Sequence, residues 1–294
     1  MKKGICYILI AALFFTFQSA FVKEIGDDSP TVIILFARFS INLLLMIPII
    51  IRDKDFSFKV KCPYILIFRC IFGIAGLSLF YYVLNYIPLA NAILLQNTRP
   101  LFIPLILLVF LRKKTVKMVV TGIIISFIGI AIIINPGAGE SFNSIALLAL
   151  LSGFFTAVVA IFLRMFIRGN NLGKTNEALF YYALFGTIVM SVILPFFWKT
   201  PSFYIILLLV GVGVFGMLFQ LFMTVSMKYL QVSIATPMMY SAVIFGGILD
   251  WVIWNDQITL AFIIGMIIVI AGAFVIVYFA PASNLQKTNP QSSN

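Results

Sequence analysis

Ten long apolar stretches run through the chain, and only short links separate them. They lie at 4–22, 31–51, 63–84, 89–111, 117–135, 144–163, 178–197, 203–226, 232–254 and 258–279. A helix needs ~20 mostly apolar residues to cross the hydrocarbon core of a bilayer. Only 10% of the residues are charged, against ~25% in a soluble domain, which is too few to cover a water-facing surface of this size. The sequence therefore predicts an all-α membrane protein with ten transmembrane helices.

The basic residues are distributed unevenly between the links on the two sides of these helices. Of the 20 Lys and Arg, only Lys23 and Lys199 fall in links on one side, whereas all others outside the stretches fall on the side of the N-terminus. Positively charged links stay in the cytoplasm. We therefore expect a multi-pass membrane protein with both termini in the cytoplasm. The net charge of +11 is then explained by basic links beside the lipid bilayer. It therefore indicates no nucleic-acid partner.

The two halves of the chain match each other at a fixed offset. Gly122 aligns with Gly265 and Gly129 with Gly272, an offset of 143 residues in both cases. The two glycines of each half are about two helical turns apart, so they share one helix face, where small residues let a neighbouring helix approach closely. We predict a duplication in which two sets of five helices insert in opposite orientations around a central cavity. The predicted units are a first repeat at 1–135, a second at 136–280, and a disordered cytoplasmic tail at 281–294.

Arg99 is the most informative polar residue, because it lies near the middle of the stretch 89–111. A charge at that depth costs ~2.5–3.5 kcal/mol on insertion scales, which makes it a functional candidate. Pro100 lacks a backbone N–H and disfavours helix at the residue before it, so we expect a loosened helix there. Arginine can grip a carboxylate or phosphate through two hydrogen bonds. We predict that Arg99 binds substrate together with Gln96 and Asn97; alternatively, it pairs with a buried carboxylate and holds the bundle together.

Two further arginines lie inside the stretches but close to their ends. Arg38 and Arg69 are shallow enough for their side chains to extend towards the headgroups. They either line the cavity or brace helix ends. The other substrate-binding candidates are Gln18, Gln220 and Tyr240, which takes the repeat position of Asn97.

Asp250 is the only acidic residue within the ten stretches, and it stands next to Trp251 near the expected outer boundary. An intramembrane carboxylate can carry a proton in coupled transport or form an ion pair. Both interpretations stay open, and the expected partner in the second is an arginine such as Arg38.

The sequence lacks residues that several kinds of catalysis and cofactor binding require. It contains no histidine, which removes the commonest general base and metal ligand. Its three cysteines have no metal-ligand spacing, and no GxxxxGK[ST] motif is present to use ATP directly. We expect no catalytic residue, metal or cofactor, and a monomer or homodimer whose partner is a small molecule. An intramembrane lipid-modifying enzyme would need a cluster of acids, a nucleophile with a base, or a metal site.

Short motifs follow one another in a characteristic order along both halves. In the first half they are Phe68-Arg69, Gly73, Tyr82, Tyr86-Ile87-Pro88-Leu89-Ala90 and Pro100-Leu101-Phe102. In the second half they are Ala235-Thr236-Pro237, Tyr240, Asp250-Trp251, Asn255-Asp256, Gly265 and Ala271-Gly272. With this order and spacing, the chain resembles the EamA-type members of the drug/metabolite transporter superfamily. Arg38 matches an arginine that is frequent early in the second span of that family.

The resemblance implies a ten-helix inner-membrane carrier, built of two inverted five-helix repeats, that works by alternating access. Members carry amino acids, nucleotide-like metabolites, vitamins, sugars or drugs. Arg112-Lys113-Lys114 replaces an acidic residue that is frequent in the family, and Arg99 stands where a small apolar residue is common. We predict a secondary transporter of a small anionic or zwitterionic metabolite, such as an amino acid or nucleotide-like compound. The alternatives are an exporter of drugs or toxic metabolites with the same fold and, from another class, the lipid-modifying enzyme.

Overall fold

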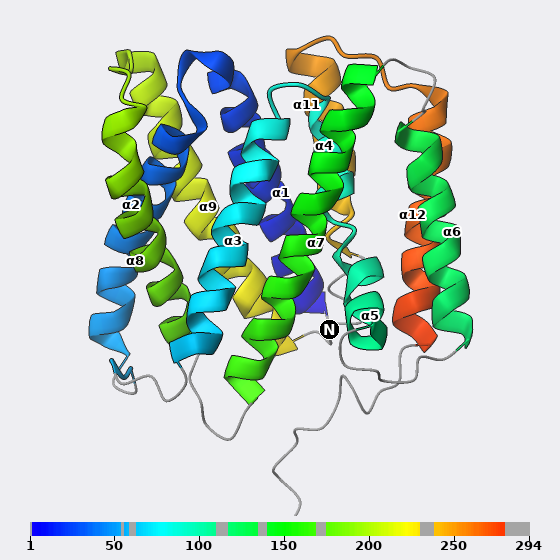
Figure 1. Ribbon diagram of the computed structural model, residues 1–294, viewed down its shortest axis with the longest axis horizontal. Helices are drawn as coiled ribbons and strands as arrows, with labels where there is room; N and C mark the ends of the chain where they lie inside the picture. Colours follow the sequence, from blue (N-terminus) through cyan, green and yellow to red (C-terminus); the bar gives the residue numbers. More distant parts are fainter. Residues whose placement is uncertain are drawn as a thin grey trace, which may run out of the picture.

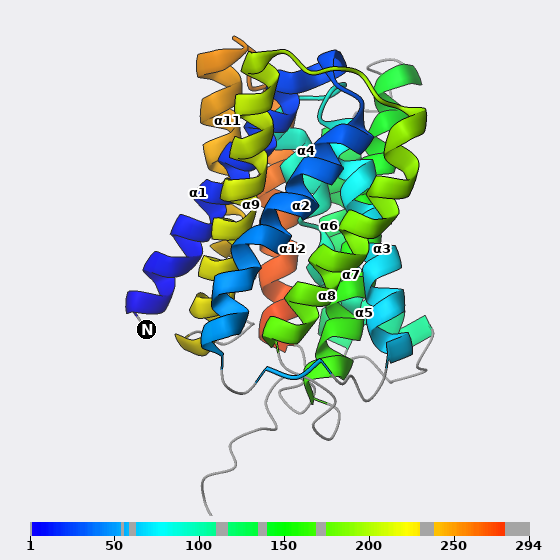
Figure 2. The same cartoon turned by 90° about the vertical axis from the view of Figure 1, so that its left-hand side faces the viewer.

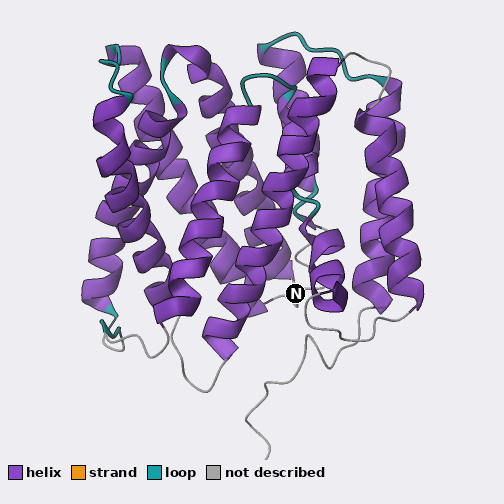
Figure 3. Ribbon diagram, in the orientation of Figure 1, coloured by secondary structure: helices purple, strands orange, loops and turns teal. Residues whose placement is uncertain are grey.

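The computed structural model describes residues 2–53, 56–58, 63–109, 117–134, 140–168, 175–229 and 238–279. All regular structure in these residues is helical (Figure 3). The helices lie side by side and form one bundle, which Figure 1 and Figure 2 show from two directions a quarter turn apart. We call the end of the bundle at which the first helix begins the near face, and the opposite end the far face.

Within the described residues, eight helices are long and apolar enough to cross a membrane, by length and composition. They are α1 (Lys2–Ile25), α2 (Thr31–Arg52), α3 (Pro63–Val83), α6 (Lys117–Ile134), α7 (Glu140–Arg168), α8 (Thr175–Ile193), α9 (Phe203–Tyr229) and α12 (Leu260–Phe279). The shorter elements are α4 (Leu89–Gln96), α5 (Arg99–Val109), the apolar α11 (Ser241–Ile253), and the 3-10 turns η1 (Gly26–Asp28) and η2 (Leu194–Phe196). The chain is therefore a multi-pass integral membrane protein, as its sequence predicts.

Two of the ten apolar stretches differ from the eight long helices. The stretch 89–111 is divided into α4 and α5 by an interruption at Asn97 and Thr98. Of the stretch 232–254, the structure describes only the part from residue 238 onwards, which contains α11. The basic residues 112–114 and the expected tail lie outside the described residues.

The outward-facing side chains of the bundle are large and apolar. Leu44 and Ile51 on α2, Ile124 and Ile128 on α6, and Ile267 on α12 are all exposed. In water such a surface would lead to association, whereas in a bilayer it meets acyl chains.

The most extensive helix contacts join distant parts of the chain. α1 packs along α9, α3 along α7, and α6 along α12, while α2 contacts both α8 and α9, and α4 contacts both α11 and α7. In the α1–α9 contact, the ring centroid of Phe215 lies 5.4–5.7 Å from those of Phe14, Phe17 and Phe21. Aromatic pairs at this distance add to the stability that their buried area provides.

Glycines allow α6 and α12 to pack backbone against backbone. A Cβ atom added to Gly122 would lie 2.9 Å from the carbonyl oxygen of Gly272, and one added to Gly129 would lie 2.7 Å from that of Gly265. A helix backbone cannot move aside as the end of a side chain can, so only glycine fits these positions. The glycines selected from the sequence thus lie at a helix contact.

Candidate substrate site

The interruption between α4 and α5 is stabilised by its own side chains. The Oγ1 of Thr98 donates a hydrogen bond to the carbonyl oxygen of Leu95 at 2.6 Å, and the Nδ2 of Asn97 donates one to that of Ile93 at 2.9 Å. The same two carbonyls also accept backbone N–H groups, that of Asn97 at Ile93 and that of Thr98 at Leu95, so the side chains add a second bond to each at the end of α4. Pro100 follows at the start of α5 and has no N–H to offer. The break expected from the sequence is therefore present, two residues before Pro100.

Arg99 begins α5 directly after this break. Its side chain is half-buried, and its Nη2 donates a hydrogen bond to the Oδ1 of Asn97 at 3.2 Å. Arg99 also interacts electrostatically with Tyr240, which ends a turn just before α11. Tyr240 is 3% exposed, and its hydroxyl has no hydrogen-bond partner among the described residues. Arg99, Asn97 and Tyr240 are thus brought together from two interrupted helices.

A glycine of α7 fits against the same break. A Cβ atom on Gly153 would lie 2.6 Å from the Oγ1 of Thr98 and 2.8 Å from the carbonyl oxygen of Leu95. Gln96, beside the break, is buried, and its backbone oxygen would lie 3.2 Å from that Cβ. The absence of a side chain at Gly153 therefore allows α7 to support the interrupted segment directly.

Arg38 belongs to a second polar group, formed by α1, α2 and α3. Its Nη1 donates a hydrogen bond to the hydroxyl of Tyr81 at 2.5 Å, and the Nε2 of Gln18 donates one to the same oxygen at 3.0 Å. A Cβ atom on Gly216 of α9 would lie 2.8 Å from the Oε1 of Gln18 and 3.1 Å from the Nη1 of Arg38. Gln220 is half-buried on α9, one helical turn from Gly216 and so on the same side of that helix.

Neither Arg38 nor Arg69 extends to the headgroups, which corrects our expectation. Arg38 is 3% exposed and Arg69 is 4% exposed. The Nη1 of Arg69 donates to the carbonyl oxygen of Ala178 at 2.8 Å, and its guanidinium carbon lies 5.0 Å from the ring centroid of Tyr182, a cation–π distance. Both arginines point into the bundle because hydroxyls, carbonyls and rings of neighbouring helices face them there.

The arginines share one electrostatic property. Among the residues that the structure describes, Arg38, Arg69 and Arg99 form no ion pair with an acidic side chain. The alternative in which Arg99 binds a buried carboxylate of the bundle has no support in the described part of the chain. Buried charge without a counter-ion is costly, so these positions favour an external anion.

Asp250 does form ion pairs, but with a lysine. The Nζ of Lys23 lies 2.7 Å from the Oδ1 of Asp250 and 2.9 Å from the Oδ2 of Asp256. The carboxylate of Asp250 also accepts hydrogen bonds from the backbone N–H groups of Leu89 at 2.9 Å and Ala90 at 2.8 Å. The expected partner, Arg38, is wrong, since Arg38 binds Tyr81 instead. These contacts tie the ends of α1, α4 and α11 together at the far face.

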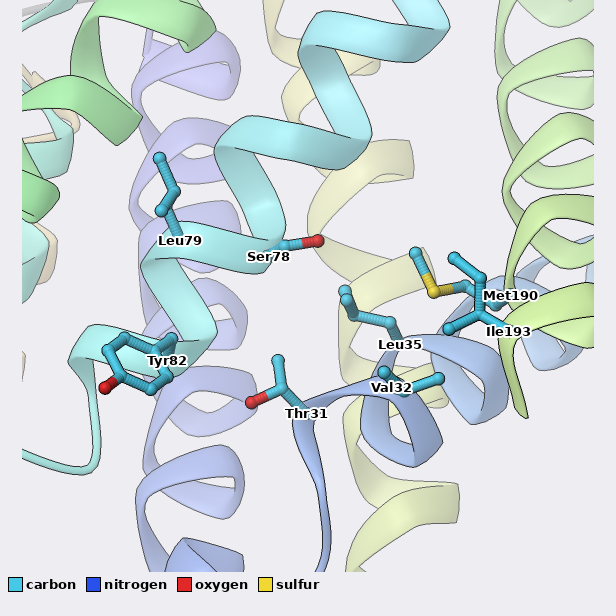
Figure 4. Close-up of a pocket in the computed structure, with 8 residues that line it drawn as sticks. All are labelled: Thr31, Val32, Leu35, Ser78, Leu79, Tyr82, Met190 and Ile193. Atoms are coloured by element: carbon cyan, nitrogen blue, oxygen red, sulfur yellow. The ribbon is translucent and has the colours of Figure 1, made fainter. Parts of the chain in front are cut away.

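A pocket of about 340 Å³ opens between α2, α3 and α8 near the far face (Figure 4). It is lined by Thr31, Val32, Leu35, Ser78, Leu79, Tyr82, Met190 and Ile193. None of the residues that the sequence selects lines this pocket. Its polar groups are the hydroxyls of Thr31, Ser78 and Tyr82, and none of the residues that line it is charged, so it has no group to pair with an ionic metabolite.

Four contributors to these polar groups were missed from the sequence: Lys23, Tyr81, Tyr182 and Gly216. Lys23 was assigned to a link, although α1 continues beyond it. Aromatic residues make up 15% of the chain, so nothing distinguishes Tyr81 and Tyr182 from tyrosines that only fill space.

A bundle of apolar helices that directs arginines inwards, without an acidic partner in the described part of the chain, and that contains a helix interrupted midway has the architecture of a membrane transporter. The model of the EamA-like transporter family matches residues 2–135 and 143–278 of the chain. The chain belongs to this family, and the resemblance found in the sequence is confirmed.

Characterised relatives carry different small molecules in different directions. The chain is 27% identical to the pseudopaline exporter CntI of Pseudomonas aeruginosa, over 92% of this chain and 95% of that protein. It is 23% identical to the S-adenosylmethionine uptake transporter of Rickettsia prowazekii, over 98% and 97% of the two chains. A solved crystal structure with 18% identity superposes with a TM-score of 0.66, over 94% of this chain and 98% of that one, and so shares the fold. The protein is therefore a small-molecule transporter.

Proposed function

We propose that the protein is a secondary carrier that moves a small anionic or zwitterionic metabolite across the bacterial inner membrane by alternating access. The observation that carries this proposal is Arg99, a half-buried cation beside a helix break with no carboxylate partner among the described residues. A substrate carboxylate or phosphate would supply the missing counter-charge through two hydrogen bonds to the guanidinium. The hydroxyl of Tyr240 has no hydrogen-bond partner among the described residues and can form a further contact with the substrate.

The carrier has ten spans in this proposal. α4 and α5 together form the fourth span, because the break between them is only two residues long. α11 is the far-face part of the ninth, whose first residues lie outside the described ranges. The positive links then place the near face in the cytoplasm and the far face outside.

The ten spans form two inverted repeats in this proposal. The family model matches the chain twice, at 2–135 and 143–278. When the two halves are exchanged, the contact of α1 with α9 becomes that of α7 with α3, and the contact of α1 with α11 becomes that of α7 with α5; all four contacts occur. Gly122 against Gly272 likewise becomes Gly265 against Gly129. This exchange symmetry supports a two-fold axis in the membrane plane.

The far face is closed in the described conformation. Lys23 holds Asp250 and Asp256, and the carboxylate of Asp250 holds the first turn of α4. Opening to the outside would separate α1, α4 and α11, and so would break these contacts. The network therefore acts as the outer gate of an alternating-access cycle.

The apolar pocket near the far face favours a second candidate, an exporter of drugs or toxic metabolites with the same fold. Its Leu35, Met190 and Ile193 walls suit an apolar molecule. An exporter of this kind would transport uncharged compounds without Arg99, whereas a metabolite carrier would need it.

Counterflow in proteoliposomes tests the proposal. Proteoliposomes are made with purified parent, Arg99→Gln or Arg52→Gln protein. They are loaded in turn with unlabelled amino acids, dicarboxylates or nucleotides, and uptake of the matching labelled compound is followed. Arg52 is an exposed arginine at the end of α2 and provides the control. We expect transient accumulation of a compound from this panel with the parent and the control, and none with Arg99→Gln. Normal counterflow in Arg99→Gln, or no counterflow of any anionic or zwitterionic compound in the parent, would contradict the proposal.

A further inference from the structure

The polar group around Arg38 contains hydrogen-bonding atoms that the described residues leave unused. The Nε of Arg38, the Oε1 of Gln18 and the Oδ1 of Asn42 are buried, and none has a partner among these residues. Buried polar atoms in folded proteins are almost always hydrogen-bonded, so a cluster of unused ones requires an explanation.

The group can donate more hydrogen bonds than it makes internally. The hydroxyl oxygen of Tyr81 accepts from both Arg38 and Gln18, which leaves its own O–H free to donate. If the amide of Gln18 is turned over, this O–H is used and the Nε2 of Gln18 becomes free instead. In both orientations at least one neutral donor stays available beside the guanidinium of Arg38.

We propose that Arg38, Gln18 and Tyr81 form a second anion subsite, so that the substrate is an organic anion with two negatively charged groups. This inference rests on the proposed function, in which one such group binds Arg99. Arg38 is buried and Arg99 half-buried, and neither cation has a counter-ion among the described residues, so two anionic groups are needed to compensate them. Arg38 lies about 10 Å from the far-face end of α2 and Arg99 about 15 Å from that of α4, at 1.5 Å per residue. The two anionic groups of the substrate therefore bind at different depths in the bundle.

Arg69 is a weaker candidate for the second subsite. Its guanidinium already lies on the ring of Tyr182 and donates to a helix carbonyl. Its neighbour Cys70 belongs to a separate small apolar cluster with Ile65 and Phe166. In the part of the chain that the structure describes, no neutral donors of other helices converge on Arg69 as Gln18 and Tyr81 do on Arg38.

A structural role for Arg38 predicts a different outcome. If Arg38 only tied α2 to α3, Arg38→Gln would destabilise the protein even without any anion. In a subsite, removal of an uncompensated buried charge leaves the empty protein as stable as before or makes it more stable, as is common at functional sites.

Thermal unfolding with a matched pair of anions separates these cases. Succinate and butyrate differ by one carboxylate, and inorganic phosphate is the third probe. Each is titrated into detergent-purified parent, Arg38→Gln, Arg99→Gln and Arg52→Gln proteins, and tryptophan fluorescence reports the unfolding midpoint. In the parent and in Arg52→Gln, succinate should raise the midpoint at a concentration at least tenfold lower than butyrate. In Arg38→Gln the two curves should coincide, and in Arg99→Gln neither anion should act.

Each other result has a defined meaning. Equal effects of succinate and butyrate on the parent would overturn the second subsite and leave the carrier proposal intact. No effect of either carboxylate on the parent would overturn the second subsite, whereas the carrier proposal falls only if counterflow also finds no anionic or zwitterionic compound. Stabilisation by phosphate alone, lost in Arg38→Gln, would show an inorganic anion site and overturn the two-group substrate. If Arg38→Gln does not fold, Tyr81→Phe takes its place, and unchanged preference for succinate in that variant would overturn the subsite.

Discussion

The carboxylate of Asp250 serves as the N-cap of a helix that begins at Leu89, 161 residues earlier in the chain. The Oδ1 of Asp250 accepts from the N–H of Leu89, and its Oδ2 accepts from that of Ala90. The first N–H groups of a helix lack partners within it, and the local cap residue, Pro88, makes no side-chain cap hydrogen bond. One carboxylate therefore fixes the start of α4 and binds the ammonium group of Lys23.

Asp250→Asn should lower the free energy of unfolding by about 3 kcal/mol, because it removes the buried partner of Lys23 and leaves one acceptor oxygen instead of two for the N–H groups of Leu89 and Ala90. Asp256→Asn is the matched control, since it affects the same lysine from a side chain that is 40% exposed, against 3% for Asp250. An exposed pair contributes about 1 kcal/mol or less. Chemical unfolding of both variants measures the difference, and equal losses would contradict the capping role of Asp250.

Exchanging the charges of Lys23 and Asp250 should not restore the function of the outer gate. In a protein with Lys23→Asp and Asp250→Lys, the ion pair can form again, but Leu89 and Ala90 lose their acceptor. We expect transport no better than in Asp250→Asn, as measured by initial rates in proteoliposomes. The variant with Lys23→Asp and Asp256→Lys retains Asp250 for comparison. Recovery of parental rates by the first exchange would show that charge alone matters at this site.

Arg99→Lys should retain less than a tenth of the parental kcat/KM for transport, because a compact ammonium cannot offer the planar pair of donors of a guanidinium. Tyr240→Phe removes one hydroxyl and retains the ring, so its loss should be smaller. The measurement is the concentration dependence of uptake for the substrate found by counterflow. If lysine at position 99 restores full activity, the site needs only a positive charge.

Gly153→Ala should disturb the helix break, because its methyl group would lie 2.6 Å from the Oγ1 of Thr98 and 2.8 Å from a backbone oxygen. Overpacking of this kind costs about 1–3 kcal/mol. Gly247→Ala provides the control, since its methyl group would meet side chains alone, at 3.3 Å and 3.9 Å. Thermal midpoints and uptake rates of both variants are compared, and an unaffected Gly153→Ala would mean that α7 does not support the break.

Features that depend on local physics were predicted correctly from the sequence. Hydropathy over twenty residues determines whether a helix can cross a bilayer, so eight of the predicted spans match long apolar helices in the described part of the chain. Pro100 acts on its immediate neighbours, and the break before it was found for the same reason. The family was recognised because its motifs retain their order along the chain.

Features that depend on which helix faces which could not be predicted. The depth of Arg38 was read correctly, but depth gives no information on whether the side chain points to lipid or towards Tyr81 on another helix. Lys23 and Asp250 are separated by 227 positions, and no local pattern relates them. The proposed second subsite became visible only when the contacts of α1, α2 and α3 were known.

The backbone contact between α6 and α12 also restricts how the sequence can change over generations. At each of the four glycines, 122, 129, 265 and 272, a carbonyl oxygen of the opposite helix lies within 2.9 Å of the place of a Cβ atom. Because the obstacle is main chain, no mutation in one helix can make room for a side chain in the other. We therefore expect selection to remove any single substitution at these four glycines. In the proposed duplication, two halves that are otherwise free to diverge would therefore keep the same residue in the same register.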